Sequence, residues 1–319
     1  ISISILFILF FNDAKVFIVN IWENIIIYFK SILSICVFIF FCNIAFTNDY
    51  ISTAKQILGE YIVGGIKNST PDFIKSLDIE YIHSDDYDST FSLNAVSSLS
   101  EGDTDAFFNQ TSIYQHDGNT TFNTGFGYRN LFNDKKIIFG INAFYDREIK
   151  VTHQRVGLGI ELLSSVFDFR SNYYEAFSKT KLVESNNTEK ALDGWDLRGD
   201  YHLPSSIVND YSVTLFASYY DWNESGGDFS SDGYKVGFTG KPYKNLFVEA
   251  AIDDDGTSNK DFYVLLNYSF KFNNIENTTK SNSNTFELET VENRMYEKVI
   301  RENRVIKVVK GAVKVKRGN

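Results

Sequence analysis

The stretch "FGINAFYDREIKVTHQRVGLGIELL", residues 139–163, decides the fold because two sets of side chains alternate along it. In its first half, Phe139, Ile141, Ala143 and Tyr145 alternate with Gly140, Asn142, Phe144 and Asp146. In its second half, Val156, Leu158, Ile160 and Leu162 alternate with Arg155, Gly157, Gly159 and Glu161. A period of two predicts strands. One face is mostly apolar and the other mixes charge, amide and glycine, so the fold depends on which face meets water.

The composition of the whole chain also favours strands. Aromatic residues make up 16% of the 319 residues, with 29 Phe and 19 Tyr against three Pro, and aromatic side chains are enriched in strands. After position 50 no run of about 20 apolar residues occurs, which excludes several membrane-spanning helices there but not a membrane β-barrel with a polar lumen. The net charge of −10 argues against nucleic acid as a partner, because phosphate binding needs a basic surface.

The N-terminal part predicts an exported protein. Lys30 precedes the apolar run "SILSICVFIFFCNIAF", and a polar segment follows, as in a secretory signal peptide. We expect an N-terminal extension and signal peptide over residues 1–47 and a short periplasmic segment over 48–73; a transmembrane anchor is the alternative for the first part. Both cysteines, Cys36 and Cys42, lie in the apolar run, so the rest of the chain has no cysteine for a disulfide, a zinc site or a nucleophile.

Alternating runs, separated by clusters of Gly, Asn, Asp and Ser, continue along residues 74–272. Twelve strands are expected, at 74–83, 87–99, 104–115, 119–129, 135–146, 151–163, 166–178, 193–202, 211–222, 232–240, 245–254 and 262–272. Each has about the length that a tilted strand needs to cross a bilayer, and the even number suits a closed outer-membrane barrel. The longest connectors follow odd-numbered strands, which predicts that those connectors face the cell surface.

The number of strands predicts which face meets water. In the last strand, bulky apolar side chains alternate with Asn267, Ser269 and Lys271. A small soluble barrel would turn its apolar face inward, but the lumen of twelve strands is too wide for inward side chains to fill as a dry core. We therefore predict an all-β, twelve-stranded antiparallel transmembrane barrel in the outer membrane, with lipid outside and polar groups in the lumen. The expected lumen charges are Glu161, Asp168, Arg170, Asp196, Arg198 and Asp200.

Six motifs occur in order along the chain: "FFNQTSIYQHDGNTTFNTGFGYRNLF" at 107–132, "FGINAFYD" at 139–146, "RVGLGIE" at 155–161, "SNYYEAFS" at 171–178, "EKALDGWDLRGDYHLP" at 189–204 and "ENRMYEKVIRENRVI" at 292–306. Together they resemble the β-domain of inverse autotransporters, the intimin and invasin family. The resemblance implies a barrel that the barrel-assembly machinery inserts into the outer membrane with the help of periplasmic chaperones. It also implies type V secretion, in which the barrel exports a C-terminal passenger, typically an adhesin, through its own pore.

The resemblance assigns a role to the end of the last strand. The sequence also departs from the pattern of the family in two respects. It implies that Tyr268, Phe270 and Phe272 form the aromatic signal that the assembly machinery binds. The peptidoglycan-binding module of many members has no room in residues 48–73, and no passenger follows within the sequence. Adhesion to a host or surface ligand is therefore expected only through a passenger beyond residue 319.

The last part of the chain, residues 273–319, is expected to be a linker and a basic tail. Residues 273–290 are rich in Asn, Ser and Thr, and residues 290–319 hold nine Lys and Arg against three Glu. We expect the tail to thread the pore, because cations gain more Coulomb energy in a confined acidic lumen than in open water. The expected tail residues are Arg294, Arg301, Asn303, Arg304 and Lys307, and the expected carboxylates include Glu161, Asp168, Asp196 and Asp200. A free basic tail is the alternative.

The sequence predicts neither catalysis nor a cofactor or metal site. The four histidines are scattered and form no i, i+4 pair. Asp200 and His202 share a face, as catalytic groups do in omptin-type proteases, but packing in the lumen explains them better because their strand ends at the periplasmic side. We therefore predict a non-enzymatic translocator and anchor that contacts outer-membrane lipid. A stand-alone porin-like or structural barrel, plugged by its own tail, is the alternative.

Overall fold

The computed structural model describes the barrel and part of the tail. The described residues are 70–85, 89–183, 187–208, 212–243, 245–256, 260–272 and 288–311. The expected signal peptide at 1–47, most of the segment at 48–73 and most of the expected linker lie outside these residues. Within the described ranges, no helix has both the length and the apolar character needed to cross a membrane.

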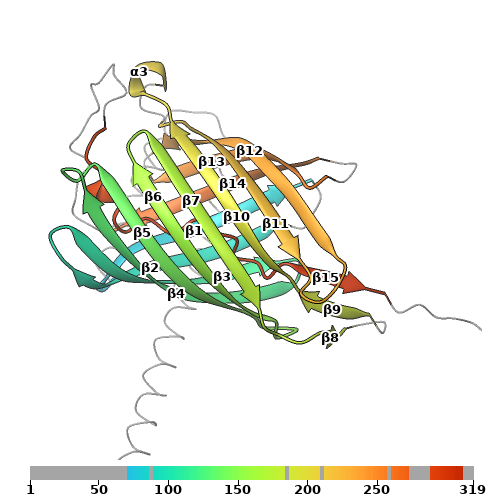
Figure 1. Ribbon diagram of the computed structural model, residues 1–319. Helices are drawn as coiled ribbons and strands as arrows, with labels where there is room; N and C mark the ends of the chain where they lie inside the picture. Colours follow the sequence, from blue (N-terminus) through green and yellow to red (C-terminus); the bar gives the residue numbers. More distant parts are fainter. Residues whose placement is uncertain are drawn as a thin grey trace, which may run out of the picture. The chain divides into compact units, whose positions relative to one another are not determined.

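Twelve strands close into an antiparallel barrel (Figure 1). They are β1 (Ile74–Ser84), β2 (Thr90–Glu101), β3 (Asp105–His116), β4 (Asn119–Phe132), β5 (Ile137–Glu148), β6 (Gln154–Ser164), β7 (Phe167–Ala176), β10 (Asp193–His202), β11 (Thr214–Asn223), β12 (Ser230–Tyr243), β13 (Leu246–Asp254) and β14 (Asp261–Lys271). Each barrel strand pairs with the barrel strands before and after it in the chain, and β1 pairs with β14 to close the ring. The predicted twelve-stranded barrel is confirmed, with strand ends that differ from the expected ones by a few residues.

Closure of the ring pairs the backbone groups of the first and last strands. Ser76 of β1 faces Lys271 of β14, and the register continues along both strands. Just after β14, the amide of Phe272 donates to the carbonyl of Lys75 at 2.9 Å. An open edge in the hydrocarbon of a membrane would leave N–H and C=O groups unpaired, and each such group is costly there. A closed ring avoids this cost.

Burial alternates along the strands and shows which face points outward. In β5, Asn142 and Asp146 are buried whereas Ile141 is exposed. In β6, Leu158 is 61% exposed while its neighbours in the strand, Gly157 and Gly159, face inward. The polar set of the opening stretch therefore faces the lumen and the apolar set faces outward. This arrangement is the reverse of that in a soluble barrel and matches a membrane barrel.

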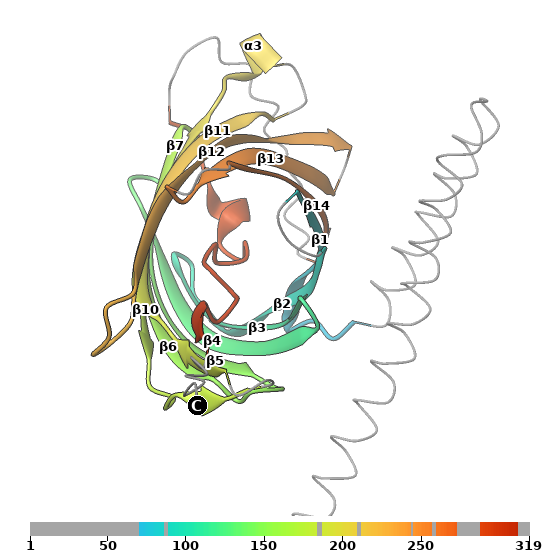
Figure 2. The same ribbon diagram turned by 90° about the vertical axis from the view of Figure 1, so that its right-hand side faces the viewer.

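The tail lies inside the ring of strands (Figure 2), and the apolar part of the interior packs against it. Val96, Phe108 of β3 and Phe144 of β5 form a buried cluster with Val299 of the tail. A second buried cluster joins side chains of β3, β4, β5 and β6 to Met295 of the tail. The tail therefore supplies apolar groups that cover apolar positions of the inner wall and remove them from water.

A second, small sheet joins the connector between β7 and β10 to the tail. It consists of β8 (Lys181–Leu182), β9 (Thr188–Ala191) and β15 (Lys307–Lys310), with β9 in the middle. The sequence did not predict this sheet, because strands of two and four residues show too little periodicity and β15 pairs with a partner far away in the chain. The described residues also contain the short helix α3 (Ser205–Val208) and the 3-10 helix η3 (Glu292–Arg294).

A cation on the outward face of β6 is expected to destabilise the barrel in lipid. Ile160 is 49% exposed on that face, near the middle of the strand. The substitution Ile160→Arg should lower the free energy of unfolding by about 2–4 kcal/mol, because a charge near the bilayer midplane is poorly solvated. Guanidinium unfolding of the protein in lipid vesicles measures the change. Ile160→Val is the control, with an expected loss below about 1.5 kcal/mol; equal stability of the Arg variant and the wild type would contradict a lipid-facing position.

Candidate functional site

The tail, residues 288–311, runs through the barrel from one mouth to the other (Figures 1 and 2). At one mouth, the amide of Glu289 donates to Ser165 Oγ at 2.8 Å, in the turn between β6 and β7. At the opposite mouth, β15 pairs with β9 in the connector between β7 and β10. In an antiparallel barrel, the connectors before and after one strand lie at opposite ends. The contacts therefore span the length of the barrel.

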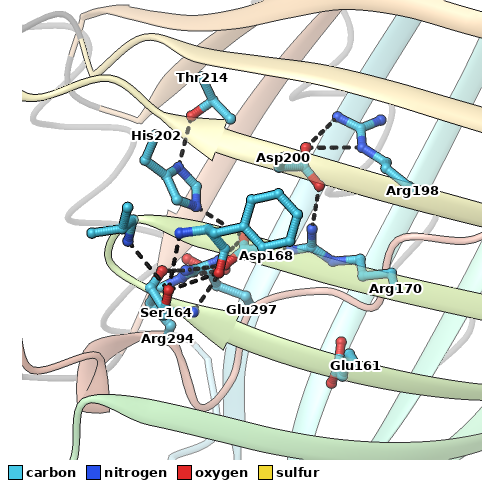
Figure 3. A network of polar contacts seen from close by, with 12 residues as sticks. Glu161, Ser164, Asp168, Arg170, Arg198, Asp200, His202, Thr214, Arg294 and Glu297 are labelled. Carbon is cyan, nitrogen blue, oxygen red and sulfur yellow. Dashed lines mark hydrogen bonds and ion pairs between the residues drawn. The ribbon is translucent and has the colours of Figure 1, made fainter. Parts of the chain in front are cut away.

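At the first mouth, Arg294 forms a two-point ion pair with Asp168 (Figure 3). Its Nη1 and Nη2 atoms lie 2.9 and 2.6 Å from the two carboxylate oxygens. Nη1 also donates to the carbonyl of Ser164 at 2.6 Å, and Nε donates to Glu297 of the tail at 3.0 Å. This two-point geometry is specific for a guanidinium group. Arg294 therefore defines the position at which the tail enters the barrel.

Further along the lumen, toward the second mouth, Asp146 of β5 lies between two arginines. Arg301 of the tail donates to both carboxylate oxygens at 2.7 and 2.6 Å, and Arg155 of β6 lies 2.8 Å from one of them. Asn123 of β4 donates a further hydrogen bond at 2.7 Å. The Arg301 guanidinium also lies 4.4 Å from the centroid of the Phe144 ring. The three charged side chains are at most 1% exposed, so removing Asp146 would leave two buried arginines without compensation.

At the second mouth, Lys307 of β15 joins two carboxylates. Its Nζ lies 3.0 Å from Glu148 and 2.8 Å from Glu189. Burial opposes the charge on Lys307, but the hydrogen bonds to Glu189 and Glu148 hold its pKa above the ordinary value. His153 contacts Glu189 through Nε2 at 3.2 Å and is hydrogen-bonded to Ser178 through Nδ1 at 2.9 Å. Burial lowers the pKa of His153. Lys307 therefore places a positive charge between two carboxylates of this mouth.

Among the described residues, the expected carboxylates Glu161 and Asp200 form no ion pair with the tail, and Asp196 interacts with Arg301 of the tail by Coulomb attraction without forming an ion pair. The lumen wall supplies partners for all three: Glu161 pairs with Arg129 at 2.5 Å, Asp200 pairs with Arg170 at 2.6 Å and with Arg198 at 2.9 Å, and Asp196 accepts hydrogen bonds from Asn172 and Tyr174 at 2.8 and 2.7 Å. All these partners lie on the inward face, on the same strand, on the adjacent strand or, for Arg129 and Glu161, two strands apart across Gly140. Asp168, by contrast, does meet a tail cation.

Two other tail residues named from the sequence have different surroundings. Arg304 Nε pairs at 3.1 Å with Glu302, which belongs to the tail itself. Asn303 presents its main-chain carbonyl to Asn123, whose Nδ2 donates at 3.0 Å. The part that these residues play in the pore stays a prediction.

The expected assembly signal lies at the end of β14. Phe270 is buried, and its ring centroid lies 4.7 Å from that of Tyr268. Phe272 follows the last residue of the strand. Binding of these residues by the assembly machinery stays a prediction.

Asp146 and Arg155 were not among the residues singled out from the sequence, although both lie on the polar face of the opening stretch. They face each other in the register of β5 and β6, so a hairpin drawn from the sequence pattern would have paired them. Arg301 could not be added to this pair from the sequence, because the depth of the tail in the lumen is a tertiary property. Among the residues that the structure describes, no group of three or more His, Cys, Asp or Glu could hold a metal ion.

Comparison with known proteins agrees with this architecture. The inverse autotransporter β-domain family matches residues 48–303. An attaching and effacing protein homolog of Escherichia coli (strain K12) is 29% identical over 117 residues, which are 36% of this chain and 39% of that protein. The inverse autotransporter adhesin YeeJ of the same strain is 28% identical over 102 residues, which are 31% of this chain and 4% of that protein. The matches therefore span less than half the length of both relatives.

Solved structures show a likeness in fold. A chain from a study of the in-meso crystallization of membrane proteins aligns with a TM-score of 0.62 and 18% identity, and the alignment covers 74% of this chain and 100% of that one. The KdgM porin aligns with a TM-score of 0.42 and 13% identity, over 60% of this chain and 98% of that one. At these identities, the first likeness concerns the fold alone.

Loss of Arg301 of the tail is expected to loosen the tail and open the pore. In Arg301→Gln, Asp146 keeps its pair with Arg155, so the barrel should still form while the tail loses its buried anchor. Ion conductance of the purified protein in a planar bilayer should rise several-fold. Arg147→Gln is the matched control, because Arg147 is an exposed arginine beside Asp146 in the same strand. Equal conductance of Arg301→Gln and the wild type would contradict an anchoring role.

Proposed function

Because the chain belongs to the inverse autotransporter β-domain family, we propose that it exports a polypeptide joined to its C-terminus through its own pore and then anchors it at the cell surface. Membership makes the chain a β-barrel of the bacterial outer membrane, of the anchor or translocator type. The export of a passenger is the step that we propose for this chain.

The path of the tail supports this proposal. Arg294 holds the tail at one mouth, Gln110 binds it near the middle of β3, and Arg301 and Lys307 hold it toward and at the other mouth. A segment joined after Asn319 would therefore follow a chain that already passes through the barrel. A tail that served only to close a pore would not need contacts along the whole lumen.

We place the mouth that contains β8, β9 and β15 outside the cell. The connector between β7 and β10 at this mouth is long enough to hold a hairpin of its own, whereas β6 and β7 are joined at the other mouth by a tight turn. Outer-membrane barrels have long loops at the cell surface and short turns in the periplasm. The tail would accordingly run from the periplasm to the surface.

A porin-like barrel plugged by its own tail is the second candidate. A cavity of about 670 Å³ in the lumen favours it. Charged side chains of the wall, such as Lys235, Glu249 and Asp200, and of the tail line this cavity. In this candidate the tail would stop solutes and would not lead a passenger outward, so a reporter joined to the tail would not need to reach the surface.

The proposal implies three kinds of partner. Outer-membrane lipid would contact the apolar outward face of the barrel. The barrel-assembly machinery, assisted by periplasmic chaperones, would insert the barrel and bind Tyr268, Phe270 and Phe272 during insertion. Adhesion to a host or surface ligand would belong to a passenger, as the name of the adhesin YeeJ suggests for that relative. We propose no enzymatic activity for the barrel itself.

An epitope joined after Asn319 is expected to reach the surface of intact Gram-negative cells that express the chain. Antibody labelling of intact and permeabilised cells measures its position. The matched control carries the same epitope after Asn133, in the connector between β4 and β5, which should be labelled only after permeabilisation because it faces the periplasm. Labelling of the C-terminal epitope only after permeabilisation would contradict export and favour the porin-like candidate.

A further inference from the structure

We infer that the lumen wall binds the main chain of whichever extended segment lies in it, through five side chains that we call the track. They are Gln110, Asn123, Arg129, Arg155 and Asn172. This inference rests on the proposed function, since it concerns how one pore accommodates segments of different sequence. The track is inferred to hold a passenger in transit by the same bonds that hold the tail.

Gln110 binds both main-chain groups of one tail residue. Its side chain is 1% exposed on β3, and its Oε1 accepts a hydrogen bond from the amide of Val299 at 2.7 Å. Its Nε2 lies 3.5 Å from the carbonyl oxygen of the same residue, which accepts the second bond. One amide side chain thus satisfies both main-chain groups of one tail residue, as a neighbouring strand would.

The other four members of the track donate to carbonyl oxygens of the tail. Arg129 donates to Met295 at 3.0 Å and to Glu297 at 2.6 Å, Asn172 to Ile300 at 3.2 Å, Arg155 to Glu302 at 2.7 Å, and Asn123 to Asn303 at 3.0 Å. Carbonyl groups are present in every residue, so these bonds do not depend on the side chains of the tail. Main-chain bonds of this kind provide affinity, whereas side-chain pockets provide specificity.

The surroundings of Asn303 show that the wall binds the main chain of this residue and not its side chain. Its carbonyl is bound by the track, but its buried Oδ1 has no hydrogen-bond partner among the described residues. The wall therefore recognises this residue as a segment of backbone and leaves its amide side chain unused. A buried polar atom without a partner is unfavourable, so replacing this side chain should cost little.

Besides the pairs of its lysines, the tail has two arginines that form two-point ion pairs with the wall, namely Arg294 with Asp168 and Arg301 with Asp146. We infer that these two pairs set the register in which the chain comes to rest. A passing segment without arginines at this spacing would form the main-chain bonds but not the two ion pairs. The track would then allow the segment to move through the lumen, and the movement would stop when the two arginines form their ion pairs.

Amide hydrogen exchange of the full chain in detergent tests the inference. In Gln110→Leu, the amide of Val299 loses its acceptor, and its exchange should become roughly tenfold faster, as expected for the loss of one hydrogen bond. The double variant Ile300→Ser with Asn303→Ala changes tail side chains and keeps the backbone. Its exchange at Val299 should stay within about threefold of the wild type.

Controls separate loss of the track from loss of the fold and from failure of export. Heat-modifiable gel mobility must show a folded barrel for each variant. If Gln110→Leu does not fold, Tyr174→Phe replaces it, because the hydroxyl of Tyr174 accepts a hydrogen bond from the amide of Glu302 at 2.7 Å; faster exchange of that amide is then expected. Unchanged exchange in the wall variant, or acceleration in the tail variant equal to that in the wall variant, would overturn the inference. A C-terminal epitope on the same proteins reports export separately, so its absence from the surface would contradict the proposed function without altering the exchange result.

Discussion

In the hydrocarbon of a membrane, a β-protein must pair every backbone N–H and C=O group within itself, and only a closed ring of strands does so. The pairing of β1 with β14 meets this requirement. Closure has a second consequence, because twelve strands enclose more space than their inward side chains can fill. The lumen must therefore contain water, polar side chains or another segment of the chain. Figure 2 shows the tail inside the ring, next to β2 through β6.

A polar lumen must also balance its charges at low solvent exposure. Much of the balance is achieved within the wall, as between Glu161 of β6 and Arg129 of β4, which meet across Gly140 of the intervening β5 on the inward face. Asp146 and Asp168 differ because each accepts hydrogen bonds from a wall arginine and a tail arginine at once. Each of these charges would be unfavourable if it were buried alone, because it loses its contacts with water. The ion pairs offset this cost of desolvation. Both carboxylates therefore couple the charges of the wall to those of the tail.

The tail is held by two kinds of contact with different physical meaning. Main-chain bonds from the track, and the strand pairing of β15 with β9, are available to almost any extended polypeptide. Ion pairs of Arg294 and Arg301 require a particular side chain at a particular place. A pore of an inverse autotransporter needs both properties if it exports a passenger and then retains an anchor. One set of contacts tolerates many sequences, and the other defines a final position.

The sequence by itself determined the strands, their number and the face that each turns outward, because a period of two is a local property and the width of a barrel follows from the strand count. It also indicated a basic tail in a chain of opposite net charge. Only the tertiary structure decided which charges meet. Asp146 pairs with Arg301, and Asp200 pairs with wall arginines, because these contacts depend on strand register and on the depth of the tail in the lumen. The sheet of β8, β9 and β15 likewise exists only once the tail has crossed the barrel, since its strands are too short to be stable or recognisable alone.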